Sequence, residues 1–343
     1  MNDTLGPIDR QRRTRLAIGL AVLTALLLVA GLAAGSDGWS LVELWRVLDG
    51  PDAQLIVGQI RAPRTLGAWL TGALLGLAGA TAQGLFRNPL ADPYLLGSAS
   101  GASLGVVLVL AAGALAGQGV SPAMADAVAR IGVVMAAFVG AWLGMLLTLA
   151  LAQGAQQTIR LLLAGVVVGV VLGAVGDLLT SAAPQALRGK QAFALGNTGF
   201  LGWGSCIMLA VGLAVCVPLT ARLARALDAL TLGEDSARSL GLALPRVRLW
   251  LVAALALATG LAVSQAGLVA FVGLVAPHLV RRFAPAPHGF TLVASAVAGG
   301  VLLLAADVLA RSLLAPREVP VGALTALLGG GYLLWLLHRR RLA

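Results

Sequence analysis

Charged residues are scarce in this chain, and their scarcity excludes most soluble folds. Only 11% of the 343 residues are charged, whereas 59% are hydrophobic and the mean hydropathy is +0.93. A soluble domain carries roughly a quarter charged residues. The chain is therefore predicted to be an integral membrane protein, and its 44 glycines suggest helices that pack closely in lipid.

Reactive and metal-binding side chains are also few. The two cysteines, Cys206 and Cys216, lie in one apolar segment and face different sides of a helix, so they cannot form a disulfide. The three histidines are scattered, and the sequence contains no phosphate-binding glycine loop, metal-ligand cluster, nucleophile triad or nucleic-acid motif. We therefore expect no enzymatic activity in this chain, no cofactor, no bound metal and no nucleic-acid partner.

Long apolar runs predict the architecture. Runs of roughly 17–25 residues are typical of transmembrane helices, and counting them predicts an all-α integral membrane protein with about ten spans, so that both termini lie on one side. The first run lacks a cleavage site and is expected to stay as a span. The expected spans are 16–35, 65–86, 97–117, 130–152, 160–182, 203–224, 246–264, 268–283, 290–312 and 320–338.

The distribution of charge predicts the orientation of these spans. With cytoplasmic termini, 16 of the 24 basic residues and 6 of the 14 acidic residues fall on the inner side, so the whole net charge of +10 lies there. This is the bias that the positive-inside rule describes. No polar stretch is long enough for a soluble domain, so we expect one transmembrane domain over residues 16–338 between cytoplasmic tails at 1–15 and 339–343.

The stretch 85–105 interrupts the apolar pattern between two expected spans. It contains Asn88, Pro89, Asp92 and Pro93, so the chain cannot remain helical there. Proline-broken polar backbone between two spans is tolerated only against protein or a water-filled cavity. Two interpretations follow: the stretch forms part of a pathway wall or gate, or it is an ordinary tight turn between two helices.

A second mixed segment, 228–242, reads DALTLGEDSARSLGL and lies on the expected cytoplasmic side. Its apolar residues recur at near-helical spacing, so one or two short helices could lie along the membrane face. Such a helix could pack on its own bundle, or it could fit a groove on a cytoplasmic partner.

Asp177 is a carboxylate inside the fifth expected span, near its outer end. Intramembrane acids are functional candidates by default. Asp177 could line a pathway, or its side chain could simply reach the membrane surface.

Several long motifs in a fixed order point to a family. They are RAPRTLGAWLTGALLGLAGATAQGLFRNPLADPYLLGSASGAS (61–103), RLLLAGV (160–166), LTLGEDSARSLGL (230–242), GLVAFVGLVAPHLVRR (267–282) and ADVLARSLLAPREVPVGALTALLG (306–329). Over nearly its whole length the chain resembles the FecCD-type permeases of ABC importers. It departs from their pattern at Gly329–Tyr332, where Gly-Ala-Pro-Phe is usual, and at Ile159, where a small polar residue is usual.

The resemblance implies a fold of ten helices in a bacterial inner membrane, and a homodimer whose pathway follows the two-fold axis within the lipid. It also implies two cytoplasmic ATPase subunits, which hydrolyse the ATP, and a periplasmic binding protein that delivers the substrate. An iron chelate, either a ferric siderophore or haem, is the expected substrate, and cobalamin is the alternative. The alternative of a different class, an ion-coupled secondary transporter, would need ionisable groups near mid-membrane and repeated halves.

The resemblance also assigns roles to residues. Matching motifs imply a cytoplasmic gate, contacts with the ATPase, and arginines that pair with glutamates of the binding protein. For these arginines, headgroup anchoring or a pair between Arg311 and Asp307 is the structural alternative. The implied residues are Asn88, Leu90, Thr158 and Ile159 for the gate, Gly233, Glu234, Ala237, Leu240 and Gly241 for ATPase coupling, and Arg61, Arg64 and Arg311 for docking.

Overall fold

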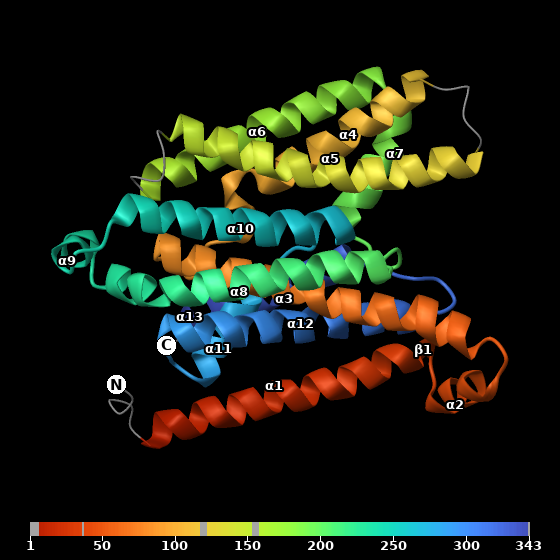
Figure 1. Cartoon of the computed structure of the whole chain (residues 1–343), viewed down its shortest axis with the longest axis horizontal. Coiled ribbons are helices and arrows are strands. Elements are labelled where there is room, and N and C mark those ends of the chain that lie inside the picture. Colours follow the sequence, from red (N-terminus) through yellow and green to blue (C-terminus); the bar gives the residue numbers. More distant parts are fainter. Residues whose placement is uncertain (1–6, 36–37, 117–121, 153–157, 342–343) are drawn as a thin grey trace.

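The structure is a computed structural model that describes residues 7–35, 38–116, 122–152 and 158–341. The described residues are mostly helical (Figure 1), and their only sheet is a small hairpin of β1 (Ala34–Gly35) and β2 (Gly38–Trp39). The predicted all-α fold class is confirmed.

The helices follow one another with short connections. In chain order they are α1 (Pro7–Ala33), α2 (Leu41–Asp49), the π-helix η1 (Gln54–Arg61), α3 (Ala62–Phe86), the 3-10 helix η2 (Pro93–Leu96), α4 (Ser98–Ala116), α5 (Pro122–Leu151), α6 (Thr158–Ala182), α7 (Gln185–Leu195), α8 (Trp203–Thr231), α9 (Glu234–Ser239), α10 (Leu244–Ala266), α11 (Val272–Phe283), α12 (His288–Ser312) and α13 (Val321–Arg341).

All ten expected spans correspond to helices, but the helices differ in length more than the apolar runs predicted. Among the described residues, seven helices are long and apolar enough to cross a membrane, and α4 and α13 are shorter apolar helices. The eighth expected span, 268–283, contains only the twelve-residue α11. Such a helix is about 18 Å long, well short of a bilayer core of about 30 Å.

The backbone before α11 explains this shortfall. Gly267 and Phe271 have φ angles of 70° and 67°, which break the helical path between α10 and α11. The non-helical segment 267–271 lies against protein, because the Leu268 N–H donates to the Phe193 carbonyl at 2.9 Å and the Tyr94 hydroxyl donates to the Val269 carbonyl at 3.1 Å. Irregular backbone at membrane depth requires such partners.

The centre of the molecule is α3, which contacts α8, α10, α11 and α12. Of the most apolar part of this helix, 89% is buried. The helices approach closely because glycines face backbone: a Cβ added at Gly76 would lie 2.1 Å from the Ser295 carbonyl oxygen, and one at Gly72 would lie 2.3 Å from the Gly299 carbonyl oxygen. Small residues in membrane helices permit this close packing.

A second group of helices, α4, α5 and α6, lies beyond α10 (Figure 1). Here α4 and α5 meet through glycines, since a Cβ at Gly101 or at Gly140 would lie 2.2 Å from the carbonyl oxygen of the other residue. The outer face of α6 is different, because a row of valines and leucines on it is exposed in the single chain, including Leu163, Val167 and Val170.

The two ends of the molecule carry different elements. The first turn of α1, the last turn of α13 and the short helix α9 lie at one end, whereas α2 lies at the other, and α7 follows the far end of α6 (Figure 1). We call these the inner end and the outer end, following the orientation that the charge distribution predicts.

Candidate functional site

The loop between α3 and η2, residues 87–92, is held in a defined turn at the inner end. Arg87 adopts a left-handed conformation with φ of 49°, which ends α3. The Asn88 side chain then accepts the Leu90 N–H at 2.9 Å, and the Asp92 side chain accepts the Tyr94 N–H at 2.8 Å to start η2. Burial raises the pKa of the Asp92 carboxyl above its usual value, and the hydrogen bond from the Tyr94 N–H offsets only part of this rise. The loop is ordered, yet Leu90 at its tip is 55% exposed.

The start of α6 lies next to this loop region. The helix passes so close to η2 that a Cβ added at Gly165 would lie 2.1 Å from the Leu95 carbonyl oxygen. Ile159, in its first turn, is 72% exposed. The side chain of Thr158 lies outside the described part of the chain. Two exposed apolar residues, Leu90 and Ile159, are therefore carried by neighbouring segments.

The segment 228–242 contains the end of α8, the short helix α9 and the start of the connection to α10. Gly233 and Gly241 bound α9 with φ angles of 106° and 80°, values that side chains rarely tolerate. These two glycines turn the chain into α9 and out of it. The segment thus forms a compact helical corner at the inner end (Figure 1).

Glu234, the first residue of α9, faces its own bundle. Its carboxylate lies 2.5 Å from Arg248 Nη2 on α10, 3.4 Å from Arg238 Nη2 and 3.9 Å from Arg87 Nη2. The Arg248 side chain is only 3% exposed. Glu234 therefore links α9 to α10 and to Arg87, the residue directly before Asn88 in the exposed loop.

The residues expected to contact an ATPase divide into two groups. Ala237 is completely buried in the core of its own chain, and Glu234 is directed inward, so neither presents its side chain outward in this structure. The burial of Ala237 follows from the helical period, which turns this position toward the bundle. Leu240 and Leu232, in contrast, are 65% and 69% exposed at the same corner.

At the outer end, Arg64 holds a carboxylate network. Its guanidinium donates to both carboxylate oxygens of Glu318, at 2.7 and 2.9 Å, and to Asp307 Oδ1 at 3.2 Å. The Arg64 hydrogen bond holds the pKa of the Glu318 carboxyl below its usual value. Asp307 is fully buried and also accepts the Thr198 hydroxyl at 2.6 Å. Because Arg311 Nη2 lies 2.5 Å from the other oxygen, Oδ2, both oxygens of Asp307 are occupied within the chain.

The other two outer arginines are buried against the end of α1. Arg311 pairs with Asp307 one turn earlier and donates to the Gly31 carbonyl at 3.0 Å, while Arg61 donates to the Leu32 carbonyl at 3.1 Å. The C-terminal end of a helix carries partial negative charge on its free carbonyl groups, so it favours nearby cations. The Arg311–Asp307 pair, which is the structural alternative to docking, is present in this structure.

Asp177 forms an ion pair with Lys190, which joins α6 to α7. The Asp177 side chain is 77% exposed, whereas that of Lys190 is 20% exposed. Asp177 is therefore at the surface of the single chain, with one cationic partner.

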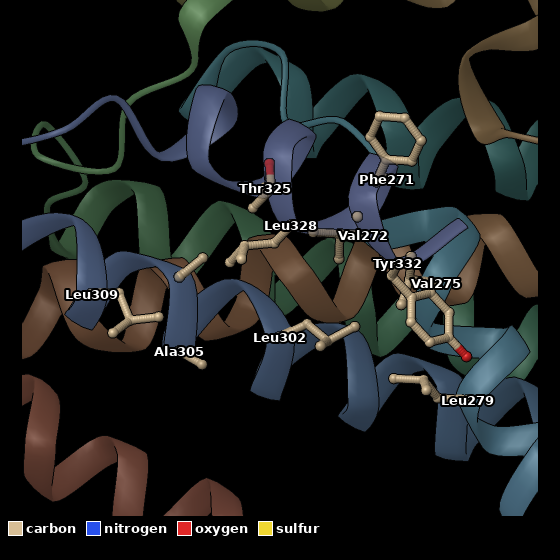
Figure 2. Close-up of a pocket in the computed structure, with 12 residues that line it drawn as sticks. Phe271, Val272, Val275, Leu279, Leu302, Ala305, Leu309, Thr325, Leu328 and Tyr332 are labelled. Carbon is tan, nitrogen blue, oxygen red and sulfur yellow. The ribbon is translucent and has the colours of Figure 1, made fainter. Parts of the chain in front are cut away.

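An apolar cavity of about 260 Å³ lies between α13, α11 and α12. Figure 2 shows Leu302 and Leu309 of α12 along one side, and Phe271 and Tyr332 near its far end. Gly329 allows α13 to approach here, because a Cβ at this position would lie 2.3 Å from the Phe271 Cβ. Gly329, the one residue of this stretch that matches the family's Gly-Ala-Pro-Phe, thus accommodates the left-handed Phe271, whereas a Cβ at Gly331 would meet nothing within 4 Å.

Several residues in these networks could not be identified from the sequence. Asp307 is a second carboxylate within an expected span. Glu318, Arg248 and Lys190 complete the ion pairs described above, and Thr198 donates a hydrogen bond to Asp307. The sequence shows which residues are charged, but it does not show how they pair, because the partners of Arg64 are more than 240 residues distant in the chain. Only the intramembrane position of Asp307 was a usable signal.

Comparisons with known proteins agree on one family. The model of the FecCD transport family matches residues 23–339. The hemin transport system permease protein HmuU of Yersinia pestis is 37% identical over 332 residues, covering 95% of this chain and 96% of that protein. The vitamin B12 import system permease protein BtuC of Klebsiella pneumoniae is 37% identical over 344 residues, covering 98% of each.

A solved structure has the same fold. It is described as an inward-facing conformation of a metal-chelate type ABC transporter, and it superimposes with a TM-score of 0.82 at 27% sequence identity. The match covers 95% of this chain and 99% of that one.

Proposed function

The chain belongs to the FecCD transport family, and from this premise we propose that it is the translocation subunit of a binding-protein-dependent importer of an iron chelate, either a ferric siderophore or haem. Its similarity to permeases for hemin and for vitamin B12 supports this substrate range, with cobalamin as the alternative. ATP would be hydrolysed by two cytoplasmic partner subunits, and a periplasmic protein would deliver the chelate. The permease would form one transmembrane domain, 16–338, in a bacterial inner membrane, with both termini in the cytoplasm.

The link from α9 to the loop 87–92 is the observation that carries this proposal. Glu234 contacts Arg248 and Arg87, and Arg87 is the first residue of the loop. A permease driven by an external ATPase needs such a connection between its cytoplasmic surface and its pathway. The exposed Leu232 and Leu240 supply an apolar surface at that corner for the partner. Gly233 and Gly241 set the direction of α9.

An ion-coupled secondary transporter is the alternative of a different class. Such proteins place ionisable groups that exchange ions near the middle of the membrane. Here Asp307 is held by Arg64, Arg311 and Thr198, and Asp177 pairs with Lys190 near the end of α6. Each of these carboxylates already has a cationic partner in the chain, which favours an ATP-driven mechanism.

Vesicles that contain the permease with its ATPase and binding protein provide the test of this function. Labelled haem, a ferric siderophore and cobalamin should be offered in turn, and at least one iron chelate should accumulate only when ATP and the binding protein are both present. A variant ATPase that binds ATP without hydrolysing it is the control and should abolish accumulation. Uptake that persists with this control, or that follows an ion gradient, would contradict the proposal.

We propose that two copies of the chain meet through the exposed apolar face of α6. Leu163, Val167 and Val170 lie on this face, and an apolar helix face can be covered by lipid or by a second copy. The family resemblance favours the second copy, with the pathway on the two-fold axis. Asn88, Leu90, Thr158 and Ile159 would then surround the axis at the inner end as a gate without charged groups, which suits a large substrate that must pass without being retained.

Cysteine cross-linking should detect this gate. In a background without Cys206 and Cys216, Ile159→Cys should give dimer bands in the closed state, and the bands should disappear when the nucleotide state opens the gate. An apolar constriction of this kind closes by excluding water. The matched control is Leu178→Cys, which is equally exposed at 72% but lies at the other end of α6. No cross-link at 159 in any nucleotide state, together with a normal one at Asn88→Cys, would remove Ile159 from the gate.

Docking of the binding protein would involve the outer arginines. In this structure Arg61 and Arg311 bind the end of α1, and Arg64 is bound by Glu318. We propose that a glutamate of the binding protein replaces Glu318 on the Arg64 fork, since a guanidinium binds carboxylates in a bidentate manner. In the vesicles described above, Arg64→Glu should therefore weaken binding-protein association, and unchanged affinity at low and moderate salt would contradict this role.

A further inference from the structure

A second cavity, of about 160 Å³, lies between α4, α6 and α7. Two glycines of α6 create this space: a Cβ added at Gly173 would meet nothing within 4 Å, and one at Gly176 would lie 3.7 Å from Lys190 Nζ. Ser100 and Ser103 of α4 also line the cavity. Two hydroxyl groups and one ammonium group thus border a small space within the membrane-spanning bundle.

Lys190 is the only lysine among the 24 basic residues of the chain. It lies on α7, which also carries Arg188 and has no acidic residue. A lysine close to the membrane-spanning segments is a functional candidate because its charge is costly there. An ammonium group with neighbouring hydroxyls is, chemically, a recognition site for an anion such as a carboxylate.

The two side chains of the Lys190–Asp177 ion pair differ in their exposure to solvent. The Asp177 side chain is 77% exposed and does not line the cavity, whereas the Lys190 side chain is 20% exposed and does. Asp177 can therefore rotate into water with little loss of stability, since an ion pair whose carboxylate is exposed is weak. Lys190 would remain between the helices and face the cavity.

We propose that this cavity receives an anionic arm of the transported chelate, and that the arm replaces Asp177 as the partner of Lys190. The inference rests on the proposed function and narrows its substrate class to chelates with a free carboxylate or a similar anionic group. The space is too small for a whole chelate, so it accepts one arm while the bulk of the molecule lies beside α6. Asp177 keeps Lys190 paired when the pathway is empty.

The first test is uptake by the complete permease, ATPase and binding-protein assembly in vesicles. Haemin and ferric dicitrate carry carboxylates, whereas haemin dimethyl ester and ferrichrome carry neither a free carboxylate nor another anionic arm. Wild-type vesicles should import a carboxylate-bearing chelate, and Lys190→Gln should raise its KM about tenfold, as the loss of one charge-assisted pair predicts. Lys190→Arg should restore most of the affinity.

Two controls make this result specific. Arg188→Gln removes a positive charge from the same helix without altering the lining of the cavity, and the KM should change less than twofold. If haemin is imported, its dimethyl ester should have a higher KM in the wild type, and Lys190→Gln should raise it no further. Import of neutral chelates alone, or an equal KM in wild type and Lys190→Gln, would overturn the inference. Import of no chelate by the wild type would instead refute the proposed function, and the inference would fall with it.

The second test uses the chemistry of a single lysine and requires no transport. A membrane-impermeant amine reagent should modify Lys190 in the assembled complex, and the chelate that is imported should slow this modification at least fivefold. Asp177→Asn should make Lys190 more reactive, because its resting partner is lost. Protection by vesicles of anionic lipid, without any protection by the chelate, would assign the cavity to a lipid headgroup and overturn the inference.

Discussion

Replacing Gly79 with valine should prevent the chain from folding. A Cβ at Gly79 would lie 1.7 Å from the Gly273 carbonyl oxygen and 2.7 Å from the Gly273 Cα, so α3 and α11 would have to separate. These are backbone atoms, which cannot turn aside as a flexible side chain would. Overpacking in a rigid core costs about 1–3 kcal/mol, and more when backbone must move. We expect the folded fraction, measured by size-exclusion chromatography in detergent, to fall at least tenfold.

The contact has this large effect because Gly273 joins three elements. A Cβ at Gly273 would lie 2.7 Å from Pro93 Cγ and 3.0 Å from the Leu75 carbonyl oxygen. The first turn of α11 is therefore wedged between α3 and η2, which follows the loop 87–92. Separation of α3 from α11 would displace the loop as well as the core.

A matched glycine elsewhere in the chain provides the control. A Cβ added at Gly19, on the exposed face of α1, would meet nothing within 4 Å. Gly19→Val should therefore give nearly the wild-type folded fraction, and Gly79→Ala should fall between the two valine variants. A Gly79→Val protein with the same melting temperature as the wild type would show that α3 and α11 do not pack as described.

The sequence predicted the helices well because hydropathy is a local property. Each apolar run corresponds to a helix, and the mixed segment 228–242 contains α9, as its helical spacing indicated. The same reasoning overestimated α11, because the chain 267–277 is continuously apolar, although its first residues are not helical. Apolar composition shows that a segment is buried in lipid or protein, and it does not show that the segment crosses the bilayer.

The site was predicted less completely, because its contacts are distant in the sequence. The resemblance pointed to Arg64, but its pairing with Glu318 and Asp307 depends on the packing of α3 beside α12. Around α9 the motif pointed to both Ala237 and Leu240, and the folded chain buries the first and exposes the second. A family motif marks positions that matter, whether they contact a partner or support the residue that does.

Replacing Glu234 with glutamine should uncouple ATP hydrolysis from transport, because Glu234 connects α9 to α10 and to the loop 87–92. Glu234→Gln removes the charge that holds Arg248 and Arg87. Arg248 is 3% exposed, and breaking a buried ion pair typically costs about 3–5 kcal/mol. We therefore expect α9 to move independently of α10 and of the loop 87–92, and the amount of chelate transported per ATP hydrolysed to fall at least tenfold.

Two further variants distinguish coupling from general damage. Arg238→Gln removes an exposed helical pair with the same glutamate, which contributes about 0.3–0.5 kcal/mol, so the transport ratio should change less than twofold. Glu234→Gln combined with Arg248→Met removes the buried positive charge together with the carboxylate, and should restore folding stability without restoring the ratio. If Glu234→Gln transports as much chelate per ATP as the wild type, in a complex that retains its ATPase, Glu234 does not connect α9 to the gate. Movement of α9 would then be transmitted by apolar packing alone, through Ala237 and Leu230, which both belong to the hydrophobic core.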